Sequence, residues 1–137
     1  MLMVDLILDI DSNFVETIFL IKEDNIFVQN TVFIEAGLIE NTAQTCSAIV
    51  GKKYFFDDNG IENENVNVIG FISALKSVKI HALPKVGDTI ITKADLVSKF
   101  VGDDYTLCTM KCKSLVEDQI LLECEINLFI QKTISVG

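Results

Sequence analysis

The sequence predicts an α+β domain in which one long helix packs against a long antiparallel sheet. Three observations predict this fold class. Apolar or small residues recur at roughly helical spacing in one segment, from Glu35 to Gly51. Strand-like segments separated by turn residues fill the second half of the chain. Two β-prone segments precede the helix, so the predicted order is two strands, one helix and a meander.

The N-terminal part of the chain predicts a hairpin. Residues 1–10 and 14–21 are apolar and β-prone, and a polar turn lies between them at residues 11–13. The acidic segment 23–25 ends this pattern. Residues 26–34 are therefore expected to form a short irregular or extended connector.

The predicted helix begins at Glu35, and its apolar or small side chains fall at Ile39, Ala43, Cys46, Ala48 and Val50. Gly51 is expected to end it, because glycine is common just past a helix C-terminus. Lys52 and Lys53 would then lie beside the negative end of the helix dipole. The many small residues of this helix would let its backbone lie close against a sheet.

Residues 54–67 are rich in acidic and amide side chains and predict a solvated loop. Strand-like runs follow it, with a turn at Pro84 to Asp88, and their bounds are 68–82, 89–100, 105–115 and 120–131. The third run places Cys108, Met110 and Cys112 on one face, and the fourth places Cys124, Ile126, Leu128 and Ile130 on its inner face. A sheet of this length must curl to cover the helix, and its edges must be paired or protected. A dimer that joins two sheets edge to edge would do both.

Composition narrows the classes of function. A length of 137 residues predicts a single domain, 1–137. The formal net charge of −9 disfavours nucleic-acid binding, and the interrupted apolar stretches predict no membrane span. The four cysteines form no Cys-x-x-Cys pair and sit in apolar patterns, which favours a reducing, cytoplasmic setting. With one His and scattered cysteines, no metal site is predicted.

Three segments carry a resemblance to a known family. Glu40, Ala43 and Gln44 form a Glu-x-x-Ala-Gln motif in the predicted helix, and Gly70 and Phe71 lead a strand toward the Pro-x-x-Gly-Asp turn at residues 84–88. An opening Met-Val-Asp at residues 3–5 also matches. On these residues the chain resembles the 3-hydroxyacyl-carrier-protein dehydratases of the hotdog superfamily. It more closely resembles the divergent dehydratase-like proteins of aryl-polyene and flexirubin-type pigment pathways.

The resemblance implies a hotdog fold, a central helix wrapped by a curled sheet, with an acyl-phosphopantetheine tunnel between two protomers. It implies acyl carrier protein or coenzyme A as the carrier of the substrate, and no cofactor besides the phosphopantetheine. The partner would be a second copy or another hotdog chain. In that family a helix Glu works with a His of the opposing protomer, so Glu40 takes the acidic role, with Gln44 one helical turn later. Gly37, Gly70 and Phe71 become candidate substrate-binding residues, and an amide at Gly37 would hold the thioester oxygen.

The chain departs from the family at its His-Phe-Pro-Gly segment. Ile26 occupies the position of the family's His, and a register shift of two residues brings Val28 there instead. Neither side chain can transfer a proton. The single His of the chain, His81, lies far downstream and is expected on the surface or on an edge strand. A homodimer is therefore expected to have little or no dehydratase activity.

Three classes of function stay open. The chain could be a dehydratase-like thioester-binding protein completed by a His-bearing partner. It could be an acyl thioesterase that uses the helix carboxylate alone, or a non-catalytic acyl-binding or scaffold protein.

The same residues also have simpler interpretations. Glu40 could merely favour the helix dipole, Gln44 could tie the helix to a loop, and Gly70 and Phe71 could be a bulge and a core aromatic. The lysines of the second half could form a landing patch for an acidic carrier protein, although lysines on outer strand faces are usually just solvated.

Overall fold

The computed structural model of the chain describes residues 2–55 and 66–134. Its elements, in chain order, are β1 (Leu6–Ile10), β2 (Phe14–Leu20), β3 (Val28–Gln29), β4 (Val32–Phe33), α1 (Glu35–Phe55), β5 (Val66–Ile80), β6 (Thr89–Val101), β7 (Tyr105–Val116) and β8 (Gln119–Ile134). Within these residues the predicted hairpin, long helix and meander are confirmed.

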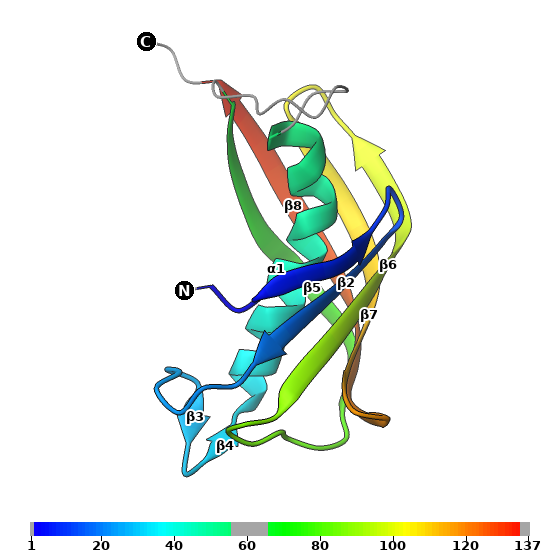
Figure 1. Cartoon of the computed structure of the whole chain (residues 1–137). Helices are drawn as coiled ribbons and strands as arrows, with labels where there is room; N and C mark the ends of the chain where they lie inside the picture. The colour runs from blue at the N-terminus through cyan, green and yellow to red at the C-terminus, as the bar shows by residue number, and fades with distance from the viewer. Residues whose placement is uncertain (1, 56–65, 135–137) are drawn as a thin grey trace.

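The main sheet has six antiparallel strands in the order β1-β2-β6-β7-β8-β5. Figure 1 shows this sheet curling around α1, with β1 and β2 drawn in front of the helix and β8 behind it. Strands β2, β5, β6, β7 and β8 all contact α1. The helix is therefore enclosed by the concave face of the sheet, as the sequence predicts.

The alternation of the strands separates a core face from a solvent face. The core lies between α1 and the concave face, and its largest buried side chains include Phe33, Leu38, Ile90, Met110, Leu122, Ile126 and Leu128. The predicted inner faces of β7 and β8 are confirmed, because Cys108, Met110, Cys112 and Cys124 are all buried. Lysine and glutamate side chains alternate with them on the convex outer face.

The connector before the helix is more ordered than predicted. Residues 26–34 contain a two-stranded hairpin, in which β3 pairs with β4. Its turn is formed by Asn30 and Thr31, which both have positive φ angles of 52° and 67°. Asn tolerates this conformation but Thr does not favour it, so the sequence carries only a weak signal for the turn.

The helix runs past its predicted end. It continues through Gly51 to Phe55, so the prediction that Gly51 ends it is wrong. A glycine inside a helix costs only about 1 kcal/mol relative to alanine, so Gly51 does not by itself end the helix. Most of the loop predicted at residues 54–67 lies outside the described residues.

Candidate functional site

The candidate catalytic pair lies on α1. The Glu40 side chain is exposed, and its Oε1 accepts a hydrogen bond from Gln44 Nε2 at 3.1 Å. The spacing of four residues places both side chains on one face of the helix. The structure therefore brings these two predicted residues together, with the carboxylate free to meet a second molecule.

Gln44 also has a structural role. Its Oε1 accepts a hydrogen bond from the backbone N–H of Met3 at 2.6 Å. One amide side chain thus orients the Glu40 carboxylate and holds the segment that leads into β1. This agrees with the simpler interpretation of Gln44 as a tie between the helix and another segment.

Asn41 completes the attachment of this segment and was not singled out in the sequence. Its side chain is fully buried, donates from Nδ2 to the carbonyl oxygen of Met3 and accepts at Oδ1 from Thr92 Oγ1, both at 2.6 Å. Both polar groups of a buried amide are therefore satisfied. The signal in the sequence was its spacing, since Asn41 lies three residues after Leu38 and five before Cys46, both buried.

Gly37 lies where the helix begins and is buried against the Phe33 ring and the Cβ atom of Phe27. A Cβ atom at this position would lie 2.5 Å from Phe33 Cζ and 2.8 Å from Phe27 Cβ, closer than real Cβ contacts allow. Its backbone N–H donates to the carbonyl oxygen of Ile34 at 2.9 Å. In the single chain this amide is thus used by the first turn of the helix, and the small size of Gly37 permits close packing.

The Pro-x-x-Gly-Asp turn at residues 84–88 ties three segments together near the start of α1. The carbonyl oxygen of Pro84 accepts from Phe33 N–H, and Val86 N–H donates to the carbonyl oxygen of Thr31, both at 2.9 Å. Gly87 N–H donates to the carbonyl oxygen of Ile21, just after β2. The turn therefore fixes the β3–β4 hairpin, and with it Phe33 against the helix.

The other two predicted binding residues lie on a different element. Gly70 and Phe71 are in β5, where they pair in register with Ile130 and Phe129 of β8. The irregularities of β5 come later, from residue 72 to 74 and from 76 to 79, so Gly70 is not in a bulge. The side chain of Phe71 lies outside the described residues.

Ile26 and Val28, the two positions compared with the family's His, lie just before β3 and at its first residue. Ile26 is 68% exposed, whereas Phe27 packs against Phe33 in an edge-to-face contact. His81 is an exposed residue just after β5, with Nε2 3.0 Å from Glu123 Oε2. This hydrogen bond from His81 lowers the pKa of the Glu123 carboxyl below its usual value. The single imidazole is thus engaged on the outer face.

The described part of the chain contains neither a metal-binding group of side chains nor a membrane-spanning helix. Within residues 2–55 and 66–134, no group of three or more His, Cys, Asp or Glu side chains could hold a metal ion. None of the helical structure in these residues has the length and apolar character needed to span a membrane. The chemistry available on α1 is that of a carboxylate oriented by an amide, a group that can exchange a proton or activate water.

Comparison with known proteins gives matches in structure alone. No protein-family model and no curated protein match the sequence. A dehydratase heterocomplex, ApeI:P of Xenorhabdus doucetiae, matches with a TM-score of 0.72 at 11% identity, over 93% of this chain and 82% of that one.

Two thioesterase structures are also similar. A hypothetical thioesterase from Streptococcus pneumoniae, solved with coenzyme A, matches with a TM-score of 0.63 at 13% identity, over 95% of this chain and 88% of that one. A thioesterase from Haemophilus influenzae matches with a TM-score of 0.60 at 11% identity, over 90% and 76%. One helix enclosed by a curled antiparallel sheet, in the arrangement of these proteins, establishes that the chain has the α+β hotdog fold.

Proposed function

We propose that the chain binds acyl thioesters and supplies the carboxylate half of a dehydratase-like site, which a His-bearing hotdog partner completes. The observation that carries this proposal is the position of Glu40. Its carboxylate is exposed on the sheet-enclosed helix and is oriented by Gln44. The chain's single imidazole is engaged elsewhere, with Glu123.

The reaction explains why such a site needs two groups. Dehydration of a 3-hydroxyacyl thioester removes a proton from the carbon next to the thioester carbonyl and expels the hydroxyl as water, leaving an enoyl thioester. One group must accept the first proton and another must protonate the departing hydroxyl. Glu40 would protonate the hydroxyl, and an imidazole from the partner would accept the carbon-bound proton.

The likeness in fold to a dehydratase heterocomplex supports a partner of a different sequence. The substrate would be an acyl group on phosphopantetheine, presented by an acyl carrier protein or by coenzyme A. Met3, which binds Gln44, and the turn at residues 84–88, which binds the hairpin before α1, would then support the site without touching substrate.

Reconstitution tests the proposal. The purified chain is mixed with a His-bearing hotdog chain, and formation of the enoyl thioester is followed by absorbance with acyl-carrier-protein and coenzyme A substrates. We expect the mixture to form the enoyl thioester and each chain by itself not to. In the mixture, Glu40→Gln should lower kcat by about 100-fold or more, as loss of a general acid does. Glu35→Gln, which removes another exposed carboxylate from the same helix, is the matched control and should leave kcat unchanged. Unchanged turnover by Glu40→Gln would remove Glu40 from the chemistry.

A thioesterase activity is the second candidate. It is favoured by the same exposed carboxylate without an adjacent imidazole, and by the likeness to two thioesterase structures. Glu40 would then activate water or attack the thioester directly. Thiol release from acyl-CoA substrates of increasing chain length measures this activity, and it should depend on Glu40. No release at any chain length discards the thioesterase, and binding without any turnover would leave an acyl-binding protein.

A further inference from the structure

We propose that the free edge of β5 selects a different hotdog chain, one whose edge strand carries acidic residues on its outer face, and disfavours a second copy of this chain. The inference rests on the proposed function, since the selected chain would be the one that completes the site. It goes further by giving the chemistry of the surface that recognises this partner.

Strand β5 is the last strand on its side of the described sheet, so its outer row of backbone groups has no neighbouring strand there. The strand is 15 residues long and carries apolar side chains toward the concave face. Leu75 and Ile80 pair with the buried Ile126 and Leu122, yet they are 39% and 37% exposed. A long edge of this kind requires a partner or protection, and an added strand would cover both side chains.

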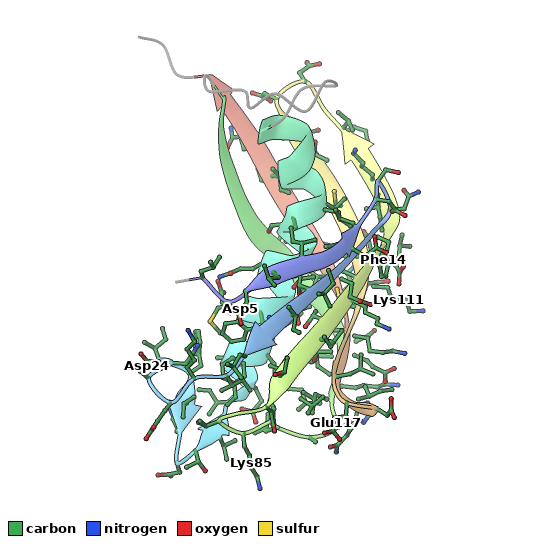
Figure 2. The ribbon with its side chains drawn as sticks, in the orientation of Figure 1. Asp5, Phe14, Asp24, Lys85, Lys111 and Glu117 are labelled. Carbon is green, nitrogen blue, oxygen red and sulfur yellow. The ribbon has the colours of Figure 1, made fainter. Side chains whose placement is uncertain are left out.

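Each of the three strands next to this edge carries charges of one sign on its outer face. These residues are Lys111 and Lys113 on β7, Glu123 and Glu125 on β8, and Lys76 and Lys79 on β5. The registers align them in two rows across the sheet, Lys111–Glu125–Lys76 and Lys113–Glu123–Lys79. Figure 2 shows Lys111 pointing away from the helix on this outer side. Across β7, β8 and β5 the sign of the charge therefore alternates, and it is positive on β5 at the edge of the described sheet.

This alternation makes the β5 edge favour a partner strand with acidic side chains on its outer face. Opposite charges on directly paired positions stabilise two strands, and like charges destabilise them. Strand β5 contains no Asp or Glu anywhere between residues 66 and 80. A second copy paired through β5 thus offers no carboxylate to Lys76 or Lys79 in any register. The strand that continues the alternation carries Asp or Glu on its outer face and apolar residues on its inner face.

A variant of the chain itself can serve as the acidic-edged probe. The double variant Lys76→Glu/Lys79→Glu is mixed with differently tagged wild-type chain, and homotypic and mixed pairs are quantified by native mass spectrometry and sedimentation. At low salt we expect the mixed pair to form about tenfold more tightly than the wild-type pair. Because the charges are solvent-exposed, the difference should shrink at high salt.

The matched control is Lys111→Glu/Lys113→Glu, which makes the same charge change on β7 in the interior of the sheet. It should show no preference for wild-type chain. If circular dichroism shows that the β5 double variant does not fold, Lys76→Gln/Lys79→Gln takes its place and should self-associate several-fold more tightly than wild type.

Four results would overturn the inference. The first three are a wild-type pair as tight as the mixed pair, an equal preference from the β7 control, and unchanged self-association of the Gln variant. The fourth is open-ended wild-type oligomers, because β1 of a second copy, which carries Asp9, would then fill the edge. The readout is association alone, so its failure is distinct from failure of the Glu40 chemistry.

Discussion

Gly37 should behave opposite to an ordinary helical glycine. Replacing glycine by alanine inside a helix normally stabilises it by up to about 1 kcal/mol. At Gly37 the added methyl group would meet the Phe33 ring at 2.5 Å, so we expect Gly37→Ala to destabilise the chain by about 1–3 kcal/mol. Urea denaturation measures the change. As a control, Ala36→Gly at the neighbouring exposed position measures the difference in helix propensity between alanine and glycine without the steric clash. A Gly37→Ala variant more stable than wild type would contradict the packing role of Gly37.

Asn41 should show the cost of leaving buried polar groups without partners. Asn41→Leu removes two hydrogen bonds of 2.6 Å, and it leaves the Met3 carbonyl and the Thr92 hydroxyl without their Asn41 partner. We expect a loss of about 2–4 kcal/mol in the free energy of unfolding. Adding Thr92→Val should recover part of the lost stability, because it removes the Thr92 hydroxyl that Asn41→Leu leaves without a partner. Equal stability of Asn41→Leu and wild type would show that this network is not needed to hold the segment at Met3.

The His81–Glu123 contact predicts a pH dependence with a defined sign. The pKa of Glu123 is lowered in the folded state, so its contribution is present above the carboxyl's usual pKa and is lost as the pH falls through the lowered value. His81→Gln should therefore reduce the thermal midpoint near neutral pH and make little difference in acid. The effect should be small, because the pair is exposed. A difference that grows in acid would contradict this assignment.

At the scale of elements, the turn at residues 84–88 should be sensitive to its glycine. Gly87 has a φ angle of +93°, and nothing lies within 4 Å of an added Cβ, so the cost of substitution is conformational rather than steric. We expect Gly87→Ala to lower stability by about 1 kcal/mol. Gly87→Asn should cost less, because Asn tolerates positive φ better. Thermal unfolding compares the two variants with wild type. Equal stability of Gly87→Ala and wild type would contradict the requirement for a glycine at this positive φ angle.

The elements that could be predicted best are those with a regular repeat. The alternation in β7 and β8 gave the buried side of each strand correctly, because a strand buried on one face must present every second residue to the core. The β3–β4 hairpin was missed, since each of its strands has only two residues. Its stability comes from Pro84 and Val86, which lie far away in the sequence.

For the whole molecule, the cysteines report on global packing. All four are free thiols buried between the helix and the sheet. A hydrogen bond with Cys112, together with burial, raises the pKa of Cys124 well above its usual value. We expect a thiol reagent to label none of them quickly in the folded chain and all of them in denaturant. Fast labelling without denaturant would show that the sheet opens away from the helix.

The sequence by itself determined the long helix, the faces of the long strands and the shared helix face of Glu40 and Gln44. All of these follow from local repeats, because residues four apart share a helix face and residues two apart share a strand face whatever surrounds them.

Only the tertiary structure decided what the polar residues bind. Gln44 and Asn41 hold Met3 from about 40 positions away in sequence, and the turn at residues 84–88 holds the hairpin before the helix. The lysine-bearing edge of β5 depends on the strand order of the described sheet, which places β5 beyond β8. Such contacts form when distant segments pack, and no local periodicity encodes which segments those will be.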